Sequence, residues 1–156
     1  GGTLPLGITA VSPKIADAFN TDDLYKSFLH GHSFTGNPIA CAAANASFDL
    51  LMADDCQKSI NRISKQQGTF INKIKNNPNV SNARNLGTII AIELNSKETS
   101  SYTNELRSKI YSYFLGRNIL LRPLGNTFYM VPPYCITEAE LNYVHSTIIE
   151  FLSTLE

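Results

Sequence analysis

The chain of 156 residues lacks several features that common protein classes require. Only 17% of its residues are charged, and 13 Lys and Arg residues are balanced by 13 Asp and Glu residues. No basic cluster could follow a nucleic-acid backbone, so the sequence argues against nucleic acid as a partner. No apolar run approaches the length of a membrane span, and we expect no membrane partner either.

Cysteine is also scarce, with three widely spaced residues: Cys41, Cys56 and Cys135. They form no C-x-x-C pair and have no histidine at ligand spacing, which argues against a disulfide framework and against a metal site. Free thiols indicate a reducing setting, and we expect a cytoplasmic protein. Hydrophobic residues make up 43% of the sequence, which suits one modest domain or one domain plus part of another.

The first third of the chain has the pattern of an α/β segment. Residues 4–11 predict a strand, residues 13–19 a short helix, and residues 25–29 an extended segment. Asn37, a favoured N-cap residue followed by proline, predicts a helix over residues 38–52. Alanines keep the surface of this helix narrow, so we expect it to be buried.

A second helix is predicted after a break at Asp54 and Asp55. Its apolar residues recur at helical spacing up to Pro78, which must end it. Beyond that proline, the β-branched run 88–94 predicts a strand. Apolar residues that share one face over residues 106–114 then predict a helix, with glycine or asparagine shortly afterwards to end it.

The last part of the chain combines a turn with a strong helix signal. The Gly-Asn dipeptide at 125–126 predicts a tight turn between strands over 119–122 and 127–131. Thr137 and Glu140 form a capping box that predicts the start of a final helix. The sequence therefore predicts an α/β fold in which a mostly antiparallel sheet has helices on one side.

The most informative stretch is residues 30–38. Gly31 allows a ligand to approach the backbone, and the N–H groups around His32 and Ser33, with the Ser33 hydroxyl, can donate to a phosphate. A glycine-rich loop before an ordinary capped helix would have the same sequence pattern. The stretch alone therefore leaves both interpretations open.

Three blocks in order carry a family resemblance: residues 1–7, residues 30–38 with the alanine-rich helix, and residues 122–134. Through essentially its whole length the chain resembles class III (fold type I) aminotransferases that use pyridoxal 5'-phosphate, most closely the branch that acts in biotin synthesis. The resemblance implies a C-terminal part of such an enzyme. Residues 1–53 would then be the end of the large cofactor-binding domain with a linker helix, and residues 54–156 the small C-terminal α/β domain.

The resemblance also implies roles for individual residues. Ser33 would bind the cofactor phosphate through its hydroxyl, and His32 would present its backbone beside it. Gly31 would lie against the substrate, Arg122 would grip the carboxylate of a keto acid through two parallel hydrogen bonds, and Tyr129 would line the substrate pocket. The glycine-rich loop would reach the neighbouring subunit's site in a homodimer.

The lysine that forms the Schiff base with the cofactor would lie upstream of Gly1. Lys14 and Lys26 do not match its position and are expected at the surface. His145, on the final helix, is expected to be packed or partly exposed. We therefore expect a C-terminal fragment that does not transfer amino groups alone. The amino donor, S-adenosylmethionine or lysine, stays open, as do a transaminase of the ω-amino-acid, ornithine or GABA type and a non-catalytic dimerisation module.

Overall fold

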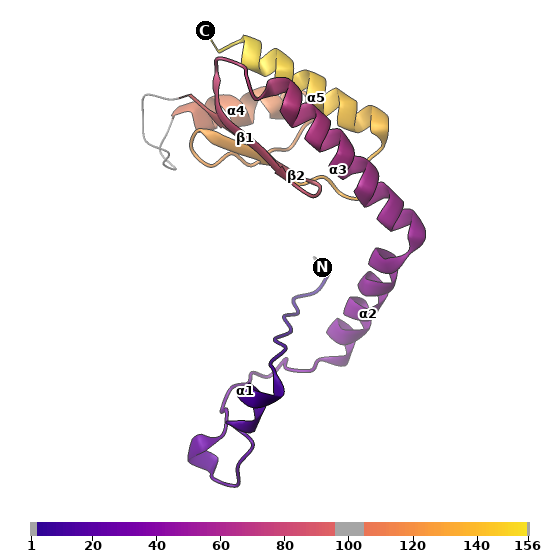
Figure 1. The fold of residues 1–156 in the computed structure, drawn as a ribbon, viewed down its shortest axis with the longest axis vertical. Helices are drawn as coiled ribbons and strands as arrows, with labels where there is room; N and C mark the ends of the chain where they lie inside the picture. The colour runs from indigo at the N-terminus through magenta and orange to yellow at the C-terminus, as the bar shows by residue number, and fades with distance from the viewer. Residues whose placement is uncertain (1–2, 96–104, 156) are drawn as a thin grey trace. The chain divides into compact units, whose positions relative to one another are not determined.

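The computed structural model describes residues 3–95 and 105–155 (Figure 1). The chain divides into two compact units, Gly1–Ala53 and Asp54–Glu156. The first unit is helical, and the second combines a sheet with helices, so the fold is mixed α/β as the sequence predicts. None of the helices in the described ranges combines the length and apolarity needed to cross a bilayer.

The first unit contains α1 (Pro13–Asp17), the 3-10 helix η1 (Leu24–Lys26) and α2 (Pro38–Met52), and no strand among its described residues. The strand predicted over residues 4–11 is wrong, because a strand needs a hydrogen-bonded neighbour and this unit offers none. The sequence reports only the apolar pattern of such a segment.

The extended segment predicted over residues 25–29 is also wrong at its start. There the carboxylate of Asp23 accepts the Tyr25 N–H at 3.0 Å, which satisfies a free amide and starts the turn of η1. A short acidic side chain of this kind favours a turn over an extended chain.

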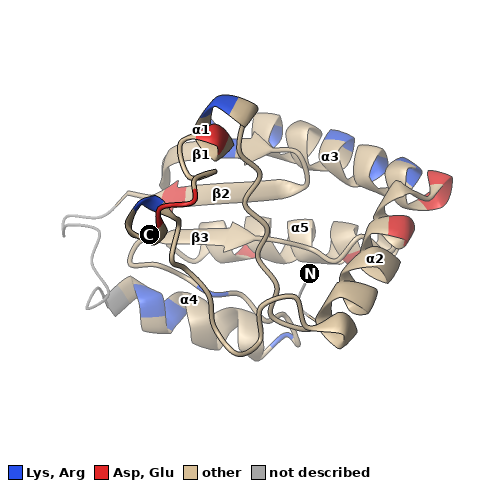
Figure 2. Ribbon diagram, turned by 90° about the horizontal axis from the view of Figure 1, so that it is seen from below, with Lys and Arg blue, Asp and Glu red and all other residues tan. Residues whose placement is uncertain are grey.

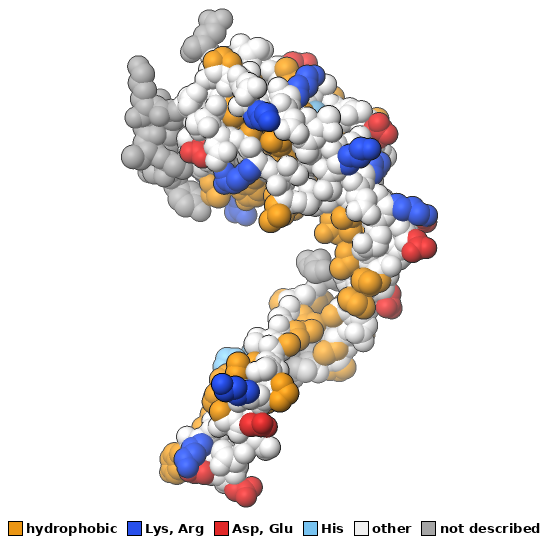
Figure 3. All heavy atoms as spheres, in the orientation of Figure 1, with side chains coloured by type: hydrophobic (Ala, Val, Ile, Leu, Met, Phe, Trp, Pro, Cys, Tyr) orange, Lys and Arg blue, Asp and Glu red, His pale blue; other side chains and the backbone are white. Residues whose placement is uncertain are grey.

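Helix α2 begins as predicted, because Asn37 Oδ1 accepts the N–H groups of Ile39 (2.9 Å) and Ala40 (3.1 Å). The expected burial is wrong, since Ala40 is its only buried residue and Phe48 and Leu50 are 61% and 72% exposed. The other described helices of this unit have five and three residues, too few to cover a helix of 15. Figure 3 shows the resulting apolar surface.

Helix α3 (Asp54–Ile74) follows α2 after the predicted break, where Ala53 has extended backbone (ψ 138°). One face of α3 is buried and consists of Ile63, Gln67, Phe70, Ile71 and Ile74. The predicted stop at Pro78 is consistent with the end of the helix four residues earlier.

Strands β1 (Val80–Leu86), β2 (Ile89–Leu94) and β3 (Thr127–Met130) form an antiparallel sheet in the order β1-β2-β3 (Figure 2). The sequence predicts β2 and β3 but not β1. Residues 119–122, expected to be a strand, are not one. A strand needs a hydrogen-bonded ladder, and beyond the Leu124–Thr127 bridge no backbone hydrogen bond between described residues joins this segment to β3.

One face of the sheet carries the core. Side chains that alternate along β2 and β3 pack on this face against α3, α4 (Glu105–Leu115) and α5 (Glu138–Ser153). Its strand residues are Ile90, Ile92, Leu94, Phe128 and Met130, each at most 5% exposed. We call the opposite side, where the intervening residues project, the open face.

Helix α4 ends in a left-handed asparagine. Asn118 has φ +60°, and its N–H donates to the Leu115 carbonyl at 3.0 Å. The next amide, of Ile119, donates to Phe114 at 3.0 Å, and both side chains are buried. These bonds form a Schellman motif, with the hydrophobic contact that commonly accompanies it. The sequence left Gly116 and Asn118 open as the residue that ends this helix, and the structure has Asn118 in that role.

The predicted turn and capping box are both present. Leu124 and Thr127 exchange backbone hydrogen bonds of 2.7 and 3.0 Å around Gly125, whose φ is +61°. At the start of α5, Thr137 Oγ1 accepts the Glu140 N–H at 3.2 Å, and the Glu140 carboxylate accepts the Thr137 N–H at 2.8 Å. The turn and the cap fix the two ends of the segment that contains β3.

Candidate cofactor loop and carboxylate-binding face

Residues 30–37, called the glycine loop from here on, are held by hydrogen bonds within the loop. Thr35 Oγ1 accepts the His32 N–H at 3.0 Å, and the His32 carbonyl accepts the Thr35 N–H at 2.9 Å. His32 Nδ1 accepts the Phe34 N–H at 3.1 Å. Gly36, with φ +67°, then directs the chain toward α2.

Ser33 lies at the centre of this turn and retains free donors. Its N–H and its hydroxyl donate to no described residue, whereas the amides on either side, of His32 and Phe34, are both used. The first free amides of α2 are taken by Asn37. Donors for an anion would therefore come from Ser33 and not from the His32 N–H, which the sequence had also suggested.

The His32 imidazole has a role that the sequence reasoning missed. A ring nitrogen that accepts an N–H carries no proton, so in the neutral ring the proton is on Nε2. The Nδ1 atom thus acts like the oxygen of an asparagine that caps its own turn. The only sequence signal for this role is the spacing: His32 precedes by two residues the amide, of Phe34, that its ring accepts.

A pocket of about 990 Å³ lies between residues 4–9 and the glycine loop, and His30 and His32 line it. Gly31 and Ser33 are not among its lining residues. A Cβ placed on Gly31 would meet no atom within 4 Å, so the packing of the chain itself does not require glycine there. Contact with a substrate, the role expected for Gly31, remains a prediction.

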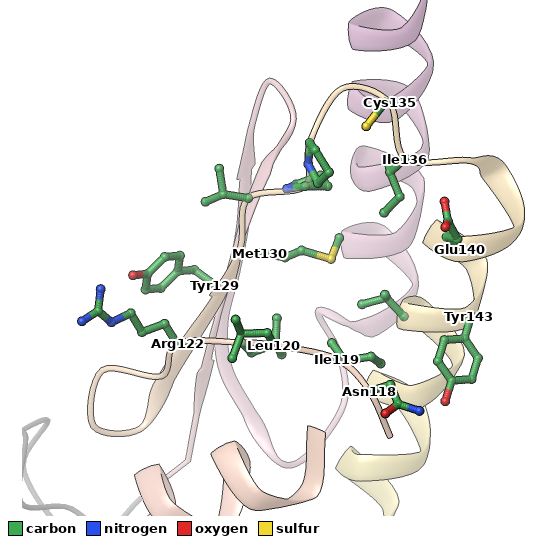
Figure 4. Close-up of a pocket in the computed structure, with 15 residues that line it drawn as sticks. Asn118, Ile119, Leu120, Arg122, Tyr129, Met130, Cys135, Ile136, Glu140 and Tyr143 are labelled. Carbon is green, nitrogen blue, oxygen red and sulfur yellow. The ribbon is translucent and has the colours of Figure 1, made fainter. Parts of the chain in front are cut away.

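Arg122 and Tyr129 lie together on the open face of the second unit. Each residue lies two positions from the Leu124–Thr127 bridge, and Figure 4 shows the two side chains next to each other on the side away from α5. Arg122 is exposed and its guanidinium donates to no described residue, while Tyr129 is half-buried. The structure therefore brings together the two residues expected to bind substrate.

An apolar row borders this pair on the open face. Leu86 pairs with Ile89 across β1 and β2, and both side chains are exposed. Leu120 and Val131, two residues from Arg122 and Tyr129 along their segments, are 77% and 59% exposed. The sequence reasoning missed this row, because it appears only once the strands are in register.

A pocket of about 690 Å³ adjoins the pair, between residues 118–122, the end of β3 and the start of α5 (Figure 4). Arg122 and Tyr129 contribute to its lining, and Met130 and Ile136 form apolar walls on the side of α5. Cys135, at its rim, is exposed. Glu140 and Tyr143 line the side of α5, so the Arg122 cation and the Tyr129 phenol lie across apolar walls from them.

His145 lies in the core and not in a site, which confirms the expected packing. Its ring stacks on Phe70 with centroids 4.0 Å apart, and Nε2 lies 2.9 Å from Gln67 Oε1. Burial lowers the pKa of His145 to about 4. Over the described ranges, no group of three His, Cys, Asp or Glu side chains is placed to hold a metal ion.

The chain matches the class III aminotransferase family over residues 1–152. It is 35% identical over 155 residues to the adenosylmethionine-8-amino-7-oxononanoate aminotransferase of Synechococcus elongatus. This alignment covers 99% of the chain and 36% of the relative. The enzyme of the same name from Helicobacter pylori is 33% identical, with 99% and 36% covered. The chain thus spans about a third of the length of the curated relatives it matches.

Solved structures show the same fold. The crystal structure of adenosylmethionine-8-amino-7-oxononanoate aminotransferase from Methanocaldococcus jannaschii superposes with a TM-score of 0.73 at 29% identity, covering 83% of this chain and 30% of that one. A Bacillus anthracis aminotransferase gives 0.76 at 22% identity, covering 93% and 34%, which supports the fold alone.

Proposed function

Because the chain belongs to the class III aminotransferase family, whose members depend on pyridoxal phosphate, we propose that the protein containing it transfers an amino group to 8-amino-7-oxononanoate. The product would be 7,8-diaminononanoate, a step of biotin synthesis. Relatives at 30 to 35% identity that cover nearly the whole chain carry the name of this activity. We propose a homodimer in the cytoplasm as its working form.

The glycine loop fits the phosphate of the cofactor. Ser33 keeps an N–H and a hydroxyl free at the centre of a turn in which the other backbone N–H groups, of His32, Phe34 and Thr35, are used, and both groups suit a phosphate oxygen. When bound, pyridoxal phosphate supplies the electron sink that amino transfer requires. The part of this chain is to hold the phosphate through Ser33 while His32 keeps the turn closed.

The open face fits the other end of the keto acid. The observation that carries the proposal is the position of Arg122 next to Tyr129, beside an apolar row. A guanidinium binds a carboxylate through two parallel hydrogen bonds, and the exposed row formed by Leu120 and Val131 can take a methylene chain. An aliphatic keto acid with a remote carboxylate has both parts.

The test uses the full-length protein that contains these residues, with 8-amino-7-oxononanoate and a panel of ω-amino-acid, ornithine and GABA-type substrates. We expect Arg122→Ala to raise KM for the keto acid by about tenfold or more, since a hydrogen-bonded charge contact is lost far from the reacting carbon. Cofactor content should stay the same. Arg107→Ala is the matched control, because Arg107 is an exposed residue of α4.

Three outcomes would contradict the proposal. Wild-type protein that uses only an ω-amino-acid, ornithine or GABA-type substrate would assign another class III activity. Unchanged kinetics of Arg122→Ala with the keto acid would remove Arg122 from the site. A full-length protein with no amino transfer to any acceptor would favour the non-catalytic dimerisation module.

A further inference from the structure

The geometry points to Arg84 as a second anchor for the carboxylate of the substrate, a role that rests on the proposed function. Arg84 lies on the edge strand β1 and is exposed. It is not part of the pocket beside β3, and nothing in the order of the sequence connects it with Arg122.

The register of the sheet places Arg84 in one row with Tyr129. Arg84 pairs with Ala91, and Ala91 pairs with Tyr129. Directly paired residues project from the same face of a sheet, so these three residues follow each other across the open face at steps of about 5 Å. Figure 4 shows Arg122 next to Tyr129 on the same side, so the row ends with a second arginine.

Ala91 makes the row suitable for a ligand. Because its side chain is a single methyl group, the row has a notch between Arg84 and Tyr129. A carboxylate above this notch would lie between the Arg84 guanidinium and the Tyr129 hydroxyl, with Arg122 beyond Tyr129. An arginine side chain is longer than one strand spacing, so the Arg84 guanidinium can reach the carboxylate from one side while that of Arg122 extends past Tyr129 from the other.

No described group neutralises Arg84. It donates no hydrogen bond to a described residue and forms no ion pair with one, although Glu93 is its diagonal neighbour on the open face. Glu93 lies instead in the next row, between Asn82 and Thr127. The row with the two arginines contains no acidic residue and is therefore complementary to an anion.

The test compares substrates with and without the carboxylate in the full-length protein. We expect Arg84→Gln to raise KM for 8-amino-7-oxononanoate by about fivefold to tenfold, with kcat within about twofold, as for one charge-assisted contact in solvent. KM for its methyl ester should not change. Arg84→Lys should restore part of the loss, and Arg107→Gln should leave both values unchanged.

Equal changes with acid and ester would show that Arg84 supports the structure and does not read the carboxylate, and no change with either would also overturn the inference. A second measurement separates this inference from the proposed function. Calorimetric titration with octanoate should show binding that weakens about fivefold in Arg84→Gln, whichever acceptor the enzyme uses. Octanoate binding equal to that of wild type would overturn the role of Arg84 even if the keto acid is the substrate.

Discussion

His145 shows what burial does to a single titratable side chain. Gln67 Nε2 donates to the Thr88 carbonyl at 3.3 Å, so Gln67 Oε1 must accept from His145 Nε2–H. The ring therefore carries a proton on Nε2 and is stacked on Phe70. Burial, which penalises the charged form, lowers its pKa from the usual 6.5 to about 4, so the ring is neutral at pH 7.

This pKa gives a stability prediction with a definite sign. Between pH 6.5 and about 4 the unfolded chain takes up a proton at His145 and the folded chain does not. The free energy of unfolding therefore decreases as the pH is lowered through this window. His145→Gln should lower the free energy of unfolding at pH 7, yet lose less than wild type on going to pH 4. Urea denaturation at both values measures this, with His30→Gln as control; parallel losses would contradict it.

Ser33 carries the cofactor prediction at the same scale. Ser33→Ala removes one hydroxyl donor to a charged phosphate, which should weaken cofactor retention by about 1 to 3 kcal/mol. Cofactor absorbance after dialysis of the full-length protein measures the loss, and Ser33→Thr, which keeps the hydroxyl, should retain the cofactor. Equal occupancy in Ser33→Ala and wild type would count against the phosphate assignment.

At the scale of elements, the start of α5 is the best-defined feature. The hydrogen bond from the Thr137 backbone, followed by that from its side chain, lowers the pKa of Glu140. Thr137→Ala breaks the capping box and should lower the free energy of unfolding by about 1 kcal/mol at neutral pH.

The capping box also makes stability depend on pH, but for another reason than His145: hydrogen bonds favour the charged form of Glu140, whereas burial disfavours the charged form of His145. A carboxylate whose folded pKa is lowered stabilises the fold above its unfolded pKa, and the contribution is lost as pH falls through the folded pKa. The difference between Thr137→Ala and wild type should therefore shrink at pH 3, and Ser153→Ala at the other end of α5 should show no such trend. A difference independent of pH would indicate that Glu140 takes no part.

Elements with local signals were predictable, and those that depend on pairing were not. The proline start of α2 and the capping box of α5 are each formed by residues that are close together in the sequence. Strand β1 was missed because its sequence is polar and only one of its seven residues is buried. Residues 4–11 and 119–122 have strand-like patterns, but neither segment belongs to a ladder of the sheet.

The same distinction applies to the candidate site. Ser33, Arg122 and Tyr129 could be selected from the sequence, because they lie in short blocks that resemble a family. Arg84 could not, since its place in one row with Tyr129 depends on the register of a strand that the sequence did not predict. The acceptor role of the His32 ring likewise required atomic positions.

At the scale of the whole molecule, the two units differ in how they bury apolar residues. The second unit has a continuous core, whereas Ile8, Phe28 and Leu29 of the first are 84%, 67% and 74% exposed (Figure 3). Apolar surface of this extent is typical of a segment that packs against other protein. We propose that the rest of the full-length enzyme and its dimer partner provide that cover.

A crystal structure of the full-length protein with pyridoxal phosphate and the keto acid tests the central claim most directly. We expect a phosphate oxygen of the cofactor within about 3 Å of Ser33 Oγ, and the carboxylate of the substrate bound to the guanidinium of Arg122. A cofactor phosphate far from the glycine loop, with the carboxylate held by residues other than those of the open face, would contradict it.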